Sequence, residues 1–239
     1  MKRYSTGILL VHGIQGNPNQ FRFLTDSMPG DFCINCLMLP GHGAGVRDFR
    51  RSGKTEWLSA VLNAAEELRA QCNKVFFVGH SMGCLLGILS ANTKPGLFDG
   101  MLLLCCPFSL HLTFSYLKYN ILSFRKAPKN PYIRAVKEAN SVRTSCPLAY
   151  LTCIHPYMDL LQLIRKAKNI DLSSIPARFI FSDRDEIVNP HSAAIAKSNN
   201  AYSIRTLSNC GHQYFTKDAK DEIVRVFFDI MGSKKNIEN

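Results

Sequence analysis

The sequence predicts an α/β fold: a mostly parallel sheet with helices on both faces. Short, continuous apolar runs recur along the chain, as expected for strands buried on both faces of a parallel sheet. Segments of helical periodicity separate these runs, and such alternation is typical of a parallel sheet. Hydrophobic residues make up 46% of the 239 residues, which is ample for a core. Without an internal repeat or a linker-like stretch, we expect residues 1–239 to form one domain.

The first quarter of the chain shows the alternation clearly. The apolar run at 7–11 predicts a first strand, and residues 19–28 predict a helix. A second strand is expected at 33–39. Apolar residues at helical spacing then predict an amphipathic helix over 55–71. Because Trp57 belongs to that apolar stripe, we assign it to the core rather than to a site.

The stretch after residue 74 organises the rest of the chain. Residues 75–78 predict a buried strand that ends in Gly79-His80-Ser81-Met82-Gly83, and an apolar helix is expected over 81–92. A serine at a sharp strand-to-helix turn has a strained backbone that holds its hydroxyl clear of the sheet, and side chains at Gly79 and Gly83 would crowd that turn. The alternative is a tight glycine turn without chemistry.

The alternation breaks after a further strand at 101–105. From residue 108 to residue 170, aromatic residues and leucines are mixed with basic residues, and only residues 156–164 have a clear helical pattern. Site loops of open α/β sheets gather at the carboxyl ends of strands, so we interpret 108–170 as a helical lid inserted over a site. The alternative is a set of ordinary helices that pack on the sheet.

Sheet character returns at 178–181. Asn189 and Pro190 are expected to open a helix as N-cap and first residue. The last strand is predicted at 202–207. A final helix follows, with a buried face formed by Ile223, Val226, Phe227 and Ile230.

The formal net charge is strongly positive, at +11. Lys and Arg are scattered, with one denser patch around Arg125, Lys126 and Lys129, so we expect no nucleic-acid partner. Attraction to anionic substrates or membrane surfaces stays open. No segment reaches the apolar length of a membrane span, and the apolar run at 8–11 is too short for a signal peptide. We therefore expect a cytoplasmic protein without stable membrane insertion.

The nine cysteines are an odd number and cannot all pair within one chain. We expect buried free thiols in a reducing compartment. The Cys33-x-x-Cys36 spacing has no second ligand pair, and the histidines lack the H-E-x-x-H spacing, so no metal or cofactor is predicted. The cysteines that fall in predicted strands or core helices are Cys33, Cys36, Cys84, Cys105 and Cys106.

Three loops that follow predicted strands carry Ser81, an aspartate pair and His212. A serine hydroxyl needs a base to take its proton, and the imidazole needs a carboxylate to orient it and stabilise its cation. The chain order serine, aspartate, histidine is typical of one class of hydrolases. The residues alone do not decide whether Asp183 or Asp185 serves the histidine.

Five motifs together resemble the α/β-hydrolases, and more narrowly the bacterial carboxylesterases and monoacylglycerol lipases. The resemblance covers nearly the whole chain. The motifs are Leu-Val-His-Gly-Ile-Gln-Gly at 10–16, Leu-Pro-Gly-His-Gly at 39–43, Gly-His-Ser-Met-Gly at 79–83, Asp-Glu-Ile-Val-Asn-Pro at 185–190 and Gly-His at 211–212.

The resemblance implies a role for each site residue. Ser81 would be the nucleophile, Asp185 the acid and His212 the base, with an oxyanion hole formed by the backbone NH groups of Ile14 and Met82. Strands that precede the first one in larger relatives are absent here. The resemblance therefore implies an α/β-hydrolase sheet of about six strands.

The resulting hypothesis is a serine esterase that acts on small carboxylic esters, with monoacylglycerols as one candidate class. Thioesterase, peptidase or acyltransferase activity on the same three residues stays open, because all share an acyl-enzyme. A non-catalytic ligand-binding protein of the same fold is the alternative from another class. The expected partner is a small-molecule ester, and the sequence does not predict an oligomeric state.

Overall fold

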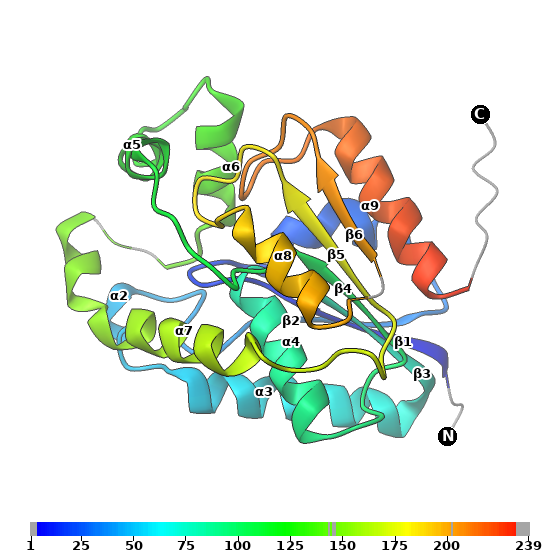
Figure 1. The fold of residues 1–239 in the computed structure, drawn as a ribbon. Coiled ribbons are helices and arrows are strands. Elements are labelled where there is room, and N and C mark those ends of the chain that lie inside the picture. Colours follow the sequence, from blue (N-terminus) through cyan, green and yellow to red (C-terminus); the bar gives the residue numbers. More distant parts are fainter. Residues whose placement is uncertain (1–3, 143, 145–146, 202, 233–239) are drawn as a thin grey trace.

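A computed structural model describes residues 4–142, 144, 147–201 and 203–232. Its centre is one six-stranded sheet in the order β2-β1-β3-β4-β5-β6, in which every neighbouring pair is parallel (Figure 1). The predicted sheet of about six strands is therefore confirmed. The strands are β1 (Tyr4–Val11), β2 (Cys33–Leu37), β3 (Cys72–His80), β4 (Gly100–Leu104), β5 (Ala177–Ser182) and β6 (Ser203–Leu207).

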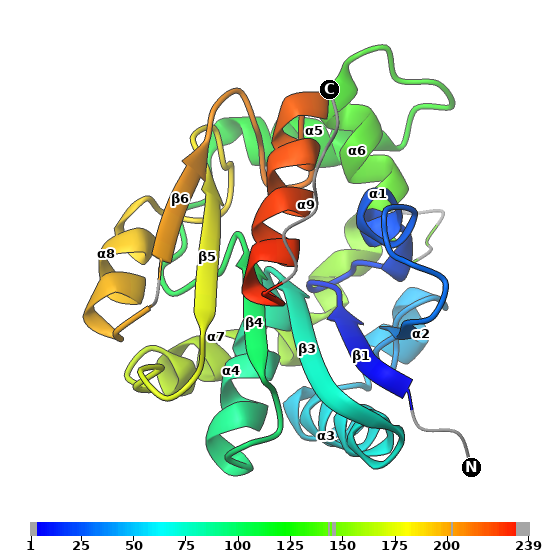
Figure 2. The same ribbon diagram turned by 90° about the vertical axis from the view of Figure 1, so that its right-hand side faces the viewer.

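Helices cover both faces of this sheet, as right-handed crossovers between parallel strands require. A first group of helices covers one face, and the chain reaches the other face before β2 and after β6, where a second group lies (Figure 2). The first group is α3 (Lys54–Gln71), α4 (Met82–Thr93) and α8 (His191–Ser198), and the second is α1 (Arg22–Thr25) and α9 (Lys217–Ile230).

Most predicted elements are present, but several ends differ. The helix predicted at 19–28 is a 3-10 turn, η1 (Pro18–Phe21), followed by the single turn of α1. The second strand stops at Leu37, before the turn through Gly41 and the short α2 (Val46–Phe49). Ser81 is the N-cap of α4 rather than its first residue, because its φ of 52° is not helical.

The start of α8 also differs by one residue. Pro190 is the N-cap, while the side chain of Asn189 accepts a hydrogen bond from the NH of His191 at 2.9 Å. The last strand matches the prediction from Ser203 onward, and Tyr202 lies outside the described residues. Of the predicted apolar face of α9, only Ile230 is half-buried rather than buried.

The 108–170 segment connects β4 to β5 and is helical in its described part. Its part from residue 114 to residue 139 lies beyond the carboxyl ends of the strands, toward which the arrowheads of β5 and β6 point in Figure 1, whereas its helix at 154–167 packs beside α3 and α4. The predicted helix at 156–164 falls inside its longest helix. The helices are α5 (Phe114–Ser123), α6 (Pro131–Ala139), η2 (Pro147–Thr152) and α7 (Ile154–Ala167).

The core lies between the sheet and its helices, and it contains several of the cysteines. Trp57 is fully buried, as predicted. Cys84, Cys105 and Cys106 are buried free thiols. The expectation of burial is wrong for Cys36, which is exposed, and Cys33 is only half-buried, because both belong to β2, one of the two edge strands of the sheet.

Candidate active site

Ser81 stands at the sharp turn between β3 and α4. Its φ of 52° and ψ of −123° are unusual for a residue with a side chain, and its NH bonds the carbonyl of Leu104 at 2.9 Å. A Cβ at Gly79 would lie 2.7 Å from the backbone nitrogen of Cys84, and one at Gly83 would overlap the carbonyl of Val11. Both flanking glycines are thus required by close backbone contacts, on opposite sides of the serine.

Three side chains from three strand-end loops form a continuous hydrogen-bonded array. The Ser81 Oγ lies 3.0 Å from Nε2 of His212. On the other side of the ring, Nδ1 lies 2.9 Å and 3.0 Å from the two carboxylate oxygens of Asp185. All three residues are buried. Because a carboxylate only accepts hydrogen bonds, Nδ1 carries the proton and Nε2 is free to accept one from the serine.

The two candidate aspartates have different partners. Asp185 faces His212 and also accepts hydrogen bonds from the NH groups of Ile187 and Val188 at 2.9 Å and 2.8 Å. Asp183 instead accepts from the NH groups of Asn209 and Cys210 at 3.0 Å and 3.1 Å. Asp183 therefore holds the loop that leads to the histidine, while Asp185 holds the histidine itself.

Burial and neighbouring charges shift the pKa values of Asp185 and His212 in opposite directions. Burial disfavours the charged form of Asp185, but the charge of His212 and the hydrogen bonds to the carboxylate outweigh it and lower the pKa of Asp185. Burial would also lower the pKa of His212. The attraction of Asp185, with a smaller contribution from Glu186, outweighs burial and raises the pKa of His212 above 6.5.

Glu186 is a buried carboxyl beside the array that sequence analysis did not single out. One of its oxygens accepts a hydrogen bond from the backbone NH of His212 at 2.8 Å. Burial raises the pKa of Glu186 above its ordinary value. The histidine is therefore held by two neighbouring acids, Asp185 on its ring and Glu186 on its backbone.

The loop after β1 lies against the serine. A Cβ at Gly13 would come within 2.8 Å of the Cβ of Ser81, so the backbone that leads to Ile14 runs directly beside Ser81. The next residue, Gln15, has a φ of 57°, which is strained for a residue with a side chain. On the other side of Ser81, Met82 is the first residue of α4 and its NH has no acceptor within the helix.

Two buried histidines hold this loop in place. Nε2 of His12 accepts from the NH of Leu39 at 3.1 Å, and Nε2 of His42 accepts from the NH of Gln15 at 3.0 Å. Burial lowers the pKa of His12 to about 3 and that of His42 to about 4, so both rings are neutral and able to accept at neutral pH. The motifs at 10–16 and 39–43 contain these two histidines, but the motifs alone do not indicate a role for either ring. Their positions just after β1 and β2 could have marked them as residues near the site.

The 108–170 segment is hydrogen-bonded to the same loop. The NH of Ser141 donates to the carbonyl of Gln15 at 2.7 Å, and its hydroxyl donates to the carbonyl of Gly16 at 2.6 Å. The side chain of Gln15 donates to the hydroxyl of Tyr157 at 2.7 Å. The strained residue is therefore bonded on several sides, partly by a segment far away in sequence.

Comparison with known proteins places this arrangement in a family. A family model described as the alpha/beta hydrolase family matches residues 8–226. The chain belongs to the alpha/beta hydrolase family.

Individual alpha/beta hydrolases are similar over nearly the full length. The chain is 27% identical over 219 residues to a thermostable monoacylglycerol lipase of Bacillus sp. (strain H-257), covering 84% of each protein. Among solved structures, one from work on the metagenome-derived lipolytic enzymes LipS and LipT gives a TM-score of 0.71 at 20% identity, covering 97% of this chain and 96% of the other. Paleococcus ferrophilus monoacylglycerol lipase gives 0.68 at 18% identity, covering 96% and 97%. At these identities the structural likeness shows the fold alone.

One group of possible metal ligands adjoins the array of this hydrolase fold. Among the described residues, ligand atoms of His80, Cys105 and His212 lie within 4.8 Å of one another. The Nε2 of His80 donates to the carbonyl oxygen of His212 at 2.8 Å, and both ring nitrogens of His212 bond Asp185 and Ser81. We interpret the group as part of the hydrogen-bond network that holds His212.

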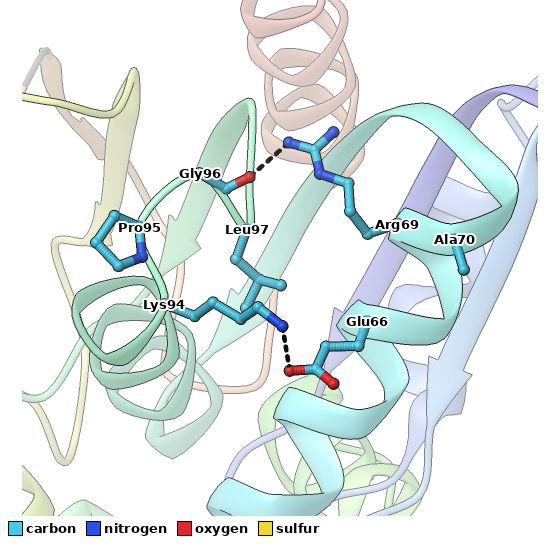
Figure 3. Close-up of a pocket in the computed structure, with 7 residues that line it drawn as sticks. All are labelled: Glu66, Arg69, Ala70, Lys94, Pro95, Gly96 and Leu97. Atoms are coloured by element: carbon cyan, nitrogen blue, oxygen red, sulfur yellow. Dashed lines mark hydrogen bonds and ion pairs between the residues drawn. The ribbon is translucent and has the colours of Figure 1, made fainter.

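A hollow of about 280 Å³ lies at the opposite end of the hydrolase sheet, between the end of α3 and the loop before β4 (Figure 3). Its charged residues are satisfied locally: Lys94 pairs with Glu66 at 2.6 Å, and Arg69 bonds the carbonyl of Gly96 at 2.6 Å. This hollow is remote from Ser81. It is a surface depression where α3 packs against the loop before β4.

Among the described residues, no helix is both long enough and apolar enough to cross a bilayer.

Proposed function

We propose that this protein is a serine hydrolase that cleaves carboxylic esters through an acyl-enzyme on Ser81. The observation that carries the proposal is the array from Ser81 through His212 to Asp185, with 3.0 Å and 2.9 Å between the bonded atoms. The strained backbone of Ser81 supports it, because strain of this kind concentrates at functional sites.

In the acylation step, the Ser81 oxygen attacks the ester carbonyl while Nε2 of His212 takes its proton. Asp185 stabilises the resulting imidazolium and keeps Nδ1 protonated. The tetrahedral intermediate carries its negative charge on the former carbonyl oxygen. Collapse of the intermediate breaks the ester bond, and the imidazolium gives its proton to the departing alcohol.

Two backbone NH groups would stabilise the oxyanion. Ile14 belongs to the loop that contacts Ser81, and Met82 opens α4 beside the serine, and this proximity supports both as donors. The positive end of the α4 dipole favours the same charge. A water molecule then attacks the acyl-enzyme with His212 as its base, releasing the acid and restoring the serine.

The substrate class we propose is small carboxylic esters, with monoacylglycerols first among them. The name of the Bacillus relative supports this class. The 108–170 segment bonds the loop beside Ser81, and its part from residue 114 to residue 139 lies beyond the carboxyl ends of the strands. We propose that this segment is the lid of the site and that residues 1–239 act as a single domain.

The proposal is tested by covalent labelling. A serine-directed fluorophosphonate should add to Ser81, as measured by intact mass and peptide mapping. Ser81→Ala should lose labelling and lower the turnover of a chromogenic ester by about 10⁴-fold or more. Acyl chains of increasing length, with thioester and amide analogues, then define the reaction class.

Ser90→Ala is the matched control. Ser90 lies on the same helix α4, is fully buried, and its hydroxyl has no hydrogen-bond partner among the described residues. This variant should label and turn over like the original protein. Undiminished labelling of Ser81→Ala would contradict the assignment, and a labelled protein without turnover of any acyl analogue would favour a non-catalytic binding role.

A further inference from the structure

Most of the positive charge of this protein comes from one part of the chain. Residues 108–170 contain ten lysines and arginines and only two acidic residues, a formal +8 out of the total of +11. One of the two acids, Asp159, is already paired with Lys54 at 2.7 Å. The excess charge arises because this segment has few acidic residues, and it is therefore a local property of the segment.

The helix α5 presents an apolar stripe to solvent. Phe114, Leu117 and Ile121 are 82%, 55% and 57% exposed. Their spacing of three and four residues places them on one face of the helix. Phe124, three residues further on and still 42% exposed, continues that stripe past the end of α5.

Basic residues flank this apolar stripe. Lys118 lies one helical turn after Phe114 at an edge of the stripe, and Arg125 follows Phe124 just past the end of α5. Both are exposed, and neither forms an ion pair with a described residue. Exposed rings with cations at their edge are typical of helices that lie in a membrane interface.

A hollow adjoins the end of this stripe. It holds about 330 Å³ between α5 and α6, and two of its lining residues, Arg125 and Lys129, are cationic. The remaining lining is mostly apolar, with Leu122, Pro128 and Ile133 among its members. A lining that combines cations with apolar side chains suits a ligand that has both a phosphate and a hydrocarbon portion.

We propose that this face of the 108–170 segment docks on an anionic phospholipid surface, with Phe114, Leu117 and Ile121 entering the interface and Lys118, Arg125 and Lys129 facing lipid phosphates. A second copy of the chain is a poor occupant, because a symmetric contact would place two such basic patches against each other. The inference is independent of the catalytic assignment, since docking requires no reaction.

Vesicle binding tests the proposal with the full chain. Flotation is measured with phosphatidylcholine vesicles and with vesicles that also contain about one third phosphatidylglycerol. We expect binding to the anionic vesicles at least tenfold tighter, and a loss of that preference in 0.5 M salt. Lys118→Gln with Arg125→Gln should weaken anionic binding by about 30-fold, since each cation near an anionic leaflet contributes about fivefold.

Phe114→Ser with Ile121→Ser should weaken binding to both kinds of vesicle. The matched charge control is Lys74→Gln with Lys197→Gln, two exposed cations outside this segment, and Tyr4→Ser is the apolar control at 46% exposure. The proposal is overturned if the original protein does not float with vesicles, or if it binds neutral and anionic vesicles equally well. It is also overturned if the stripe variants bind vesicles as tightly as these controls. Retention on immobilised polyglutamate without vesicle binding would also overturn it, and would assign the patch to an acidic protein.

Discussion

The strand-end loops and the 108–170 segment meet at the same site but are stabilised in different ways. Ser81, Asp185 and His212 are buried, and each is held by backbone hydrogen bonds at the carboxyl end of a strand. The 108–170 segment has no strand in its described part and exposes large apolar side chains such as Phe114 and Leu148 to solvent.

This difference separates two tasks. A hydrogen-bonded array requires atoms held to a few tenths of an ångström, which buried strands and close glycine contacts provide. The proposed lid requires accessible apolar surface instead, and exposed side chains such as Phe114 and Leu148 provide it. The two regions touch at Ser141 and Gln15, where the segment bonds the loop beside the serine.

The largest loss of activity is expected in the strand-end loops, at Asp185. Asp185→Asn preserves the shape of the side chain but favours the wrong histidine tautomer, so ester turnover should fall by about 10²- to 10⁴-fold at an unchanged melting temperature. Asp183→Asn should lose far less activity, because Asp183 bonds only backbone NH groups. Kinetics and thermal unfolding of both variants decide the matter, and a well-folded but inactive Asp183→Asn would reverse the assignment.

The rigidity of the strand-end loops can be broken at Gly83. A Cβ there would overlap the carbonyl of Val11 at the end of β1, so Gly83→Ala should reduce the free energy of unfolding by about 3 kcal/mol or more. At Gly30 nothing lies within 4 Å of the added Cβ, and Gly30→Ala is the control. Urea unfolding compares the two, and equal stability would show that the contact relaxes without cost.

The contact between the two regions is tested at Ser141. Its hydroxyl donates to the carbonyl of Gly16 and accepts from the NH of Gly43 at 3.1 Å, and Ser141→Ala leaves both groups unpaired. We expect kcat to fall by about tenfold with a smaller change in KM, because the loop carries a proposed oxyanion donor. Thr152→Ala removes an exposed hydroxyl of the same segment and should change little. Parallel losses in both variants would point to a general loosening of the segment.

The smallest expected effect concerns pH. His212 must be neutral to act as a base, and its raised pKa places the acid limb of kcat/KM above pH 6.5, with activity falling as the pH drops through that limb. Glu186→Gln keeps an acceptor for the His212 NH but removes a charge that raises this pKa. The limb should therefore move to lower pH by less than one unit. A limb that stays in place, with folding intact, would show that Asp185 alone sets the pKa.

Much of this molecule followed from local patterns. Apolar runs such as 75–78 predict buried strands, because a strand covered on both faces needs no polar alternation. Parallel strands bring their carboxyl ends to one edge, so the loops that carry Ser81 and His212 were expected at one site. The exposure of Cys36 could not be predicted, because the run at 33–39 does not indicate which strand lies at the edge.

The sequence by itself determined the class of fold, the serine turn and the order of the three side chains, since each depends on short-range spacing. Only the tertiary structure decided which carboxylate faces His212, because Asp183 and Asp185 leave the same strand and differ only in what lies opposite. It also showed that the neutral rings of His12 and His42, together with Ser141, hold the loop beside the serine by hydrogen bonds. Hydrogen bonds between residues as far apart as 15 and 141 depend on how the chain folds back, and no local pattern contains that information.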